Sequence, residues 1–459
     1  MGLNWLADAE PETFWAHHGW TDFAAWPEKD YAVAILPVHA LARHGDDRPL
    51  DFEEVVGARL LRAAIAQVKM RFAVRVLPPL RFVPAAGSGG YFALDFETAH
   101  ELLAEIAAGV AAAGFRKLVF FNTSPGSEPW VRAAATDARA GLELRTYVIH
   151  AASLGLDLGR GDTGDAARLA ARLAGLLAEI RQHFAPPLPP SVVEPPRPPV
   201  VPAEAFPAYR AHYLPALTPI RLASLPVDQR RLAVVPTGAI EQHGSHLPVG
   251  TDAILGQALL SAALARLPPD PGVLVAPPVT YGKSVEHQGF PGTISLSTRT
   301  LRRLGLAIAG QLRDLGFTRL AFLNTHGGNS LVLAALAREI GEHFGIEATL
   351  LRHGYEPDVS PQEAAWGIHA GEWETSLMLA AAPELVRMDR AACEYPARLD
   401  DPGELRPEHA AATFAWMTRD LSHSGVMGDA TRATGEKGKR WLSGAAGALA
   451  DKIRRLSGG

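Results

Sequence analysis

The chain has 459 residues, enough for about three domains of ~150 residues each. Hydrophobic residues make up 47% and charged residues 20%, which favours a packed core and excludes global disorder. Asp plus Glu (49) exceeds Lys plus Arg (44), and the net charge of −5 argues against a chain that coats nucleic acid or an anionic membrane. Cys393 is the single cysteine, so any metal ion must be held by His, Asp and Glu.

The N-terminal residues carry early acidic side chains and no long apolar run. We therefore expect no secretory signal. An uncharged apolar stretch of ~18 residues is also missing from the sequence, so we expect no membrane span and a cytoplasmic protein.

Strand and helix signals alternate in both halves of the chain. YAVAILPV (31–38) precedes the helical stretch EEVVGARLLRAAIAQV (53–68), and RLAVVPTG (231–238) precedes AILGQALLSAALARL (253–267). This alternation predicts mostly parallel sheets flanked by helices.

A proline-rich segment separates the halves. Residues 186–202, PPLPPSVVEPPRPPVVP, predict a stiff, extended spacer. We expect one domain over residues 1–185, a linker over 186–217 and a second domain over 218–459.

The two halves also resemble each other. AILPVHALARHG (34–45) aligns with AVVPTGAIEQHG (233–244) at an offset of 199, with five of twelve residues identical. GFRKLVFFNT (114–123) aligns with GFTRLAFLNT (316–325) at an offset of 202, with six of ten identical. Two collinear matches predict a tandem duplication of one α/β domain.

Side chains that can bind metal concentrate in the second half. Glu241 and His243 follow a predicted strand, and residues two apart in an extended chain project to the same side. His326 follows another strand, and Asp252 precedes a helix. Open α/β sheets bind ligands at the carboxyl ends of their strands, so these side chains are candidate ligands. Taken alone, however, Asp252 also fits a helix N-cap.

His369, Glu372 and Glu374 lie at a predicted helix start, and His369 and Glu372 share a helical face. The two glutamates also fit first-turn carboxylates that the helix dipole favours. At the repeat offsets, the candidate ligands Glu241, His243, Asp252 and His326 correspond to Ala42, His44, Glu53 and Ser124. The first half is therefore expected to share the fold and lack the metal site.

The motifs of the second half resemble those of the creatininase (creatinine amidohydrolase) family. The matching segments are GAIEQHGSHLPVGTD (238–252), HQGFPGTISL (287–296), NTHGGN (324–329), HAGEWETS (369–376) and SGVMGDATRATGEKG (424–438). The resemblance implies two three-layer α/β/α domains, the first one degenerate, and hydrolysis of an amide-type C–N bond in the second.

The resemblance also implies two divalent metal ions per chain, zinc or manganese with iron as an alternative. The implied ligands are Glu241, His243, Asp252 (bridging both ions), His326 and Glu372. Creatininase takes its remaining carboxylate ligand from two residues beyond the third-motif His, where this sequence has Gly328. Glu372 is the expected substitute and Glu374 the second choice. The departure weakens the case for creatinine as the substrate.

Two cations that share a carboxylate can hold a water molecule and lower its pKa to near neutrality, which gives hydroxide without a strong protein base. The leaving amine then needs a proton, and His369 is the candidate shuttle, with a helix-capping or supporting role as the alternative. We therefore expect His369 and Glu372 to be the catalytic side chains. Glu286 and His287 either line the pocket or belong to a solvated loop.

The expected substrate is a small-molecule amide (a cyclic amide or formamide) or a peptide. One alternative is a peptidase that matures a ribosomally made peptide, and another is a binding or scaffold protein without catalysis. Because family members assemble from similar subunits, we expect a homo-oligomer, and we expect no nucleic-acid or membrane partner.

Overall fold

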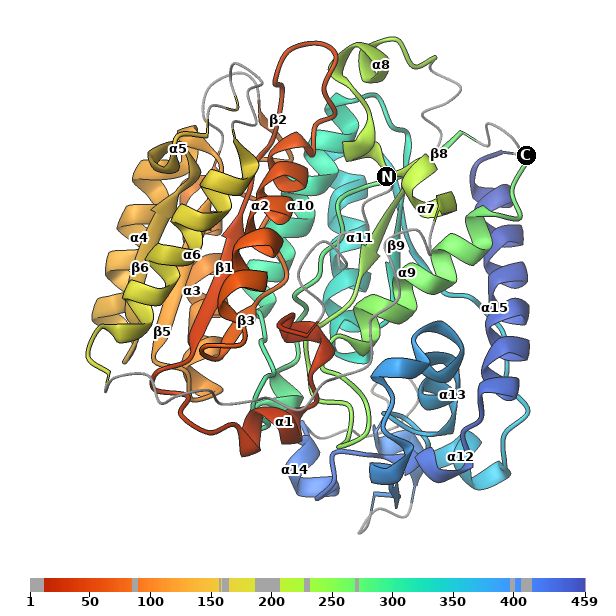
Figure 1. The fold of residues 1–459 in the computed structure, drawn as a ribbon. Helices are drawn as coiled ribbons and strands as arrows, with labels where there is room; N and C mark the ends of the chain where they lie inside the picture. Colours follow the sequence, from red (N-terminus) through yellow and green to blue (C-terminus); the bar gives the residue numbers. More distant parts are fainter. Residues whose placement is uncertain are drawn as a thin grey trace.

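The computed structural model describes residues 12–84, 90–156, 158, 165–185, 207–226, 232–268, 272–396, 401–405 and 415–458. Most of the proline-rich segment expected to be a linker lies outside these residues. Within them the chain forms two four-stranded parallel sheets side by side, one in each half (Figure 1). No helix among the described residues is long and apolar enough to cross a membrane.

The first sheet has the strand order β3-β1-β5-β6. Its strands are β1 (Val33–Val38), β3 (Val74–Val76), β5 (Lys117–Asn122) and β6 (Arg145–His150). The helices of this half are α1 (Trp20–Ala25), α2 (Phe52–Val68), α3 (Phe96–Ala112), α4 (Glu128–Gly141), α5 (Ala151–Leu154) and α6 (Ala166–Gln182). The central strands β1 and β5 are buried throughout, as expected where helices cover both faces of a parallel sheet.

The second sheet has the equivalent order β8-β7-β9-β10. Its strands are β7 (Leu232–Thr237), β8 (Val273–Val275), β9 (Arg319–Asn324) and β10 (Glu347–Leu351). The helices of this half are α7 (Pro207–His212), α8 (Pro219–Ala223), α9 (Thr251–Leu264), α10 (Thr298–Asp314), α11 (Ser330–Phe344), α12 (Pro361–Trp366), α13 (Glu372–Ala381), α14 (Thr418–Leu421) and α15 (Gly435–Leu456). Short two-stranded pairs join β2 (Leu41–Ala42) to β4 (Gly90–Tyr91) and β11 (Cys393–Glu394) to β12 (Gly428–Asp429).

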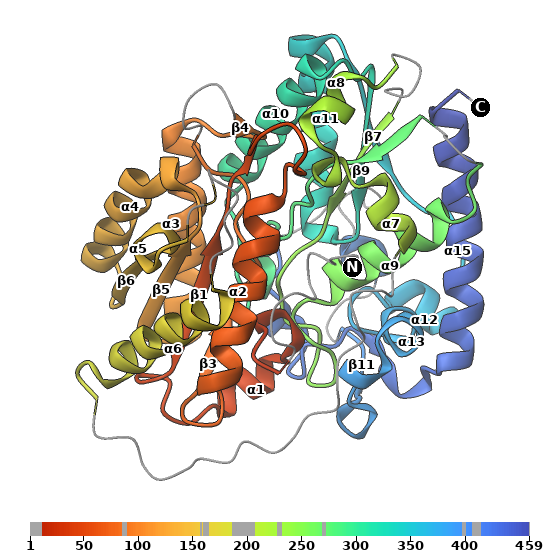
Figure 2. The ribbon, with the colours of Figure 1, turned by 45° about the horizontal axis from the view of Figure 1, so that its top comes forward.

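Each half has three layers. On one face α2 packs with α6 and α9 packs with α15; on the other face α3 packs with α4 and α10 packs with α11 (Figure 2). The predicted fold class, two α/β/α units with mostly parallel sheets, is confirmed.

The strand registers of the two sheets coincide under the offsets read from the sequence. Val33 lies opposite Val74 in the first sheet, and Leu232 lies opposite Val273 in the second, both 199 residues later. The isolated bridges Phe14–Val76 and Tyr213–Val275 follow the same shift. Tyr213 thus packs on the second sheet, although it lies within the segment 186–217 that was expected to be a linker.

The interface between the halves has the reciprocity of a two-fold axis. Backbone amides of Leu50 and Asp51 donate to the carbonyls of Leu217 and Pro215, at 3.1 and 3.0 Å. Shifted by 199 residues, the amides of Val249 and Gly250 donate to the carbonyls of His18 and Ala16, at 2.8 and 2.9 Å. Helices α3 and α10, which are equivalents, also pack on each other, and one apolar core runs through both halves.

Candidate metal centre

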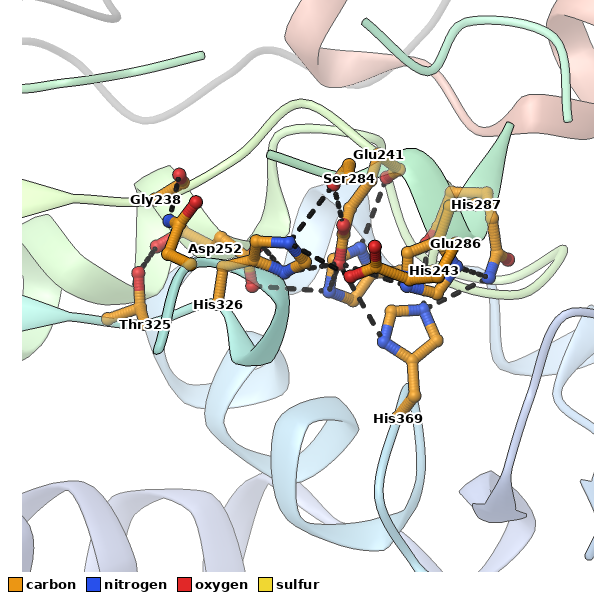
Figure 3. Close-up of polar contacts among 12 residues, drawn as sticks. Gly238, Glu241, His243, Asp252, Ser284, Glu286, His287, Thr325, His326 and His369 are labelled. Carbon is orange, nitrogen blue, oxygen red and sulfur yellow. Dashed lines mark hydrogen bonds and ion pairs between the residues drawn. The ribbon is translucent and has the colours of Figure 1, made fainter. Parts of the chain in front are cut away.

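The candidate ligands of the second half meet at the carboxyl edge of its sheet (Figure 3). Glu241 and His243 lie in the loop after β7, Asp252 lies in the first turn of α9, and His326 follows β9. All four side chains are buried, with at most 5% of each residue exposed. The sequence prediction that these residues converge agrees with this geometry.

Asp252 lies between two imidazoles. Its Oδ1 is 3.3 Å from His243 Nε2, and its Oδ2 is 3.6 Å from His326 Nδ1. Glu241 Oε1 is 3.1 Å from His326 Nδ1 and 3.8 Å from His243 Nε2. A carboxylate that faces one imidazole with each oxygen has the arrangement of a ligand shared by two cations.

Two atoms at the centre of this cluster lack the hydrogen bonds that buried polar groups normally make. Among the described residues, His243 Nε2 and Asp252 Oδ2 are buried and have no hydrogen-bond partner. Leaving such atoms unpaired costs free energy, and nearly all buried polar groups find partners. The donor set of imidazoles and carboxylates therefore fits divalent metal ions such as zinc.

Two further histidines, His287 and His369, lie beside Glu241 in this cluster. His287 Nε2 and His369 Nδ1 lie 3.5 and 3.8 Å from Glu241 Oε1, and their rings stack with centroids 4.2 Å apart. His369 Nε2 donates to the Gln242 carbonyl at 2.8 Å, which leaves the Nδ1 lone pair facing Glu241. Burial, followed by the charges of His287 and His243, holds the pKa of His369 well below its usual range. His369 is therefore a neutral base at neutral pH.

The two glutamates of α13 have different surroundings. Glu374 shares a group of possible ligand atoms, all within 4.8 Å of one another, with His243 and His369. The carboxylate of Glu372 instead forms an ion pair with Lys437, and none of the ligand groups in the described part of the chain includes it. Residues two apart on a helix point in directions about 200° apart, so only one of them can face the centre. The structure brings Glu374, and not the expected Glu372, to this cluster.

Glu286 is a carboxylate that the motifs did not single out as a ligand. Its Oε1 lies 3.4 Å from His326 Nε2, and it forms a group of possible ligand atoms with Glu241 and His326. A Cβ atom added to Gly328 would lie 2.0 Å from this oxygen. The carboxylate of Glu286 therefore fills the space where a side chain at position 328 would begin.

Burial and closely spaced charges shift the pKa values of the side chains in this cluster. Burial raises the pKa of Glu241 to about 7, against the opposing charge of His326. Burial alone would lower the pKa of His243, but the negative charge of Asp252 raises it to about 9. Carboxylates and imidazoles thus share protons here, and cations would take the place of those protons.

Asparagines hold the loops that carry these side chains. Asn329 Oδ1 accepts from the Lys283 amide at 2.8 Å, and its Nδ2 donates to the Gly238 carbonyl at 3.0 Å. Asn324 Nδ2 donates to the His326 carbonyl at 2.7 Å. His246 is in none of the groups of possible ligand atoms among the described residues, and it pairs with Thr375 Oγ1 at 2.8 Å.

A cavity of about 390 Å³ adjoins the centre at the carboxyl ends of β9 and β10. His326 and Glu374 reach it, Leu255, Leu259 and Leu377 form apolar walls, and Arg352 and His353 also line it. This volume lies in the range of small-molecule sites.

The first half keeps the framework of this site without its ligands. Asn122 Nδ2 donates to the Ser124 carbonyl at 2.7 Å, as Asn324 does to that of His326. At the positions equivalent to Glu241, His243 and Asp252, the side chain of Ala42 has no atom that could bind a metal, and His44 Nε2 pairs with Glu53 Oε1 at 2.9 Å. A carboxylate and an imidazole that satisfy each other leave no set of converging ligands.

Comparisons with known proteins agree with this geometry. The family model described as creatininase, creatinine amidohydrolase, matches residues 16–187 and 217–453. The chain therefore belongs to the creatininase family, as the motifs predicted, and is an amidohydrolase of that metal-dependent family.

Among particular relatives, the "Mycofactocin precursor peptide peptidase" of Mycolicibacterium smegmatis is 37% identical over 226 residues, which cover 49% of this chain and 85% of that protein. The "Creatinine amidohydrolase" of Pseudomonas putida is 33% identical over 241 residues, covering 48% and 88%. A solved structure named creatinine amidohydrolase (creatininase) is 26% identical and covers 51% of this chain and 96% of its own, with a TM-score of 0.42.

Proposed function

We propose that the second half, residues 218–459, hydrolyses an amide-type C–N bond with two divalent metal ions, zinc or manganese with iron as an alternative. The observation that carries this proposal is Asp252, whose carboxylate lies between His243 and His326 and has an unpaired buried oxygen. Glu241 and His326 would hold one ion, His243 and Glu374 the other, and Asp252 both. Glu374 takes the place that the motifs had given to Glu372.

When bound, two such ions would supply Lewis-acid chemistry that polarises an amide carbonyl and lowers the pKa of a water molecule to near neutrality. The chain's own residues supply the rest. His369 is neutral, and its Nδ1 lone pair faces the cluster, so it can accept the proton that the attacking water releases and pass it to the amine nitrogen as the C–N bond breaks. The apolar walls around Leu255 and Leu259 exclude water from one side of the substrate.

For the substrate we favour a peptide or modified-peptide amide. Relatives named as peptide peptidases are 37% identical, and the adjoining cavity of about 390 Å³ offers apolar walls beside its polar end. A small cyclic amide is the second candidate, supported by the relative named creatinine amidohydrolase.

We also propose that the chain is a tandem duplication whose first half, residues 1–185, is catalytically silent. The shared strand order, the constant offsets and the reciprocal interface support this proposal. The fused chain is a cytoplasmic enzyme that assembles further into a homo-oligomer.

The test is metal-dependent hydrolysis by the full chain. Dialysis against a chelator should abolish cleavage of amide-containing peptides, and zinc or manganese should restore it. Failure of the purified chain to bind divalent metal would contradict the proposal and favour the scaffold alternative.

A further inference from the structure

The first half touches the metal-binding loops through its N-terminal arm, defined here as residues 12–26. The carbonyls of Ala16 and His18 accept the amides of Gly250 and Val249 at 2.9 and 2.8 Å. Val249 and Gly250 lie three and two residues before Asp252, and the Val249 carbonyl in turn accepts the Glu241 amide at 2.9 Å. Two successive hydrogen bonds through Val249 thus connect the arm to the backbone of Glu241.

The arm also holds the second loop of the site. Trp15 is fully buried, and its Nε1 donates to the Gly292 carbonyl at 2.9 Å. Phe23 packs so closely on Gly292 that an added Cβ would lie 2.3 Å from its ring. Next to Gly292, Thr293 Oγ1 accepts the Gln242 amide at 3.0 Å. One arm therefore ties together the loop with Glu241 and the loop with His287.

We propose that this arm is a positioning element of the metal centre, so that the silent half completes a site whose ligands all lie in the other half. The inference rests on the proposed metal-dependent function. Metal affinity depends on how rigidly the surrounding partners hold the ligands, and removing such a partner commonly weakens it 10–100-fold.

The equivalent backbone contact in the opposite direction, from the second half to the first, packs less closely beside the silent site. The carbonyl of Pro215 accepts the Asp51 amide at the position that Gly250 occupies in the second half. Asp51 carries a side chain there and pairs with Arg210. A Cβ at Gly250 would instead lie 2.6 Å from the Ala16 carbonyl oxygen, so the arm packs more closely beside the metal ligands than its counterpart does beside the silent site.

Gly250→Ala in the full chain tests the proposal, because the three atoms nearest to its new Cβ all belong to Ala16. We expect zinc affinity, measured by competition with a chelator, to fall at least ~10-fold. Trp15→Phe, which removes the donor to Gly292 and part of a buried ring, should weaken zinc binding in the same direction. Hydrogen exchange of the loop amides at 249–250 should accelerate in Gly250→Ala.

Two controls separate positioning from stability. Gly447→Ala adds a methyl group to α15 at a position where no neighbouring side chain or element among the described residues lies within 4 Å, and it should leave zinc affinity unchanged. Leu173→Ala removes a fully buried side chain of α6, a helix that packs on α2, and should lower the unfolding temperature without weakening zinc binding. Zinc affinity within twofold of the unmodified chain in both arm variants would overturn the proposal. An unmodified chain that binds no zinc would instead overturn the metal centre itself.

Discussion

At the scale of single residues, the two carboxylates of α13 are expected to have different roles: we propose Glu374 as a metal ligand, whereas Glu372 forms an ion pair with Lys437. Glu374→Gln should lose one of the two ions, because an amide replaces a charged ligand close to His243. Glu372→Gln should keep both ions and lower the free energy of unfolding by about 1.5–3 kcal/mol, since Lys437 loses its charged partner. Metal analysis with urea denaturation checks both. If Glu374→Gln retained both ions, Glu374 would not be a ligand, and another carboxylate would have to complete the site.

Glu286 offers a second residue-scale prediction. Its carboxylate is 3.4 Å from His326 Nε2, on the side of the ring away from Asp252. A carboxylate behind a metal-binding histidine fixes its orientation and raises its basicity. Glu286→Gln should therefore weaken metal affinity by about 10–100-fold, measured by chelator competition. The exposed Glu342→Gln is the control and should bind metal normally.

His39 in the first half predicts a pH dependence of stability. Burial lowers its pKa to about 4, with Glu54 opposing and Arg81 adding to the effect. The unfolded chain takes up a proton near pH 6.5 while the folded chain does not, so stability falls as pH decreases from 6.5 to 4. The contribution is about 3 kcal/mol. His39→Gln should flatten the pH dependence of urea unfolding in this window; an unchanged slope would contradict the burial of a neutral imidazole.

The sequence predicted four of the converging residues because strand ends meet at one edge of a parallel sheet. It placed Glu374 second after Glu372, because the choice between the two depends on how α13 is rotated about its axis. Glu286 was also ambiguous, since its position depends on the turn that folds Val285–His287 over Gly328. Tertiary packing sets both features, and neither has a local signal.

At the scale of elements, α3 of the first half packs against a loop that supports the candidate ligand Glu241. Gly109 of α3 faces Ile294, whose amide donates to the Ile240 carbonyl beside Glu241. A Cβ at Gly109 would lie 2.8 Å from Ile294 Cγ1. The strands and helices themselves followed from hydrophobic pattern, but this close approach between halves could not be derived from it.

Gly109→Ala and Gly175→Ala form a matched pair at this scale. Ala favours a helix interior over Gly by about 1 kcal/mol, so Gly175→Ala, with no atom within 4 Å, should raise the unfolding temperature. In Gly109→Ala the crowding against Ile294 should outweigh this gain and destabilise by about 1–3 kcal/mol. Calorimetry of both variants would measure the two changes in stability. Equal stabilisation by the two substitutions would argue against tight packing of α3 on the loop that contains Ile294.

At the scale of the whole molecule, the halves share one apolar core and exchange backbone hydrogen bonds in both directions. An apolar interface of this kind is costly to expose, which would account for the retention of a first half that we propose to be catalytically silent. Residues 205–459 expressed alone should aggregate or lose activity, measured by size-exclusion chromatography and hydrolysis assays. A soluble, fully active fragment would give the first half an unrelated purpose.

In the proposed metal centre the carboxylate of Asp252 serves two metal ions, and the metal content of Asp252→Ala tests this arrangement most directly. The full chain, loaded with zinc and freed of excess metal, should hold two ions. Asp252→Ala should hold none, because both ions lose a ligand at once. One full equivalent retained by Asp252→Ala would contradict the shared carboxylate, and an unmodified chain without zinc would contradict the metal centre.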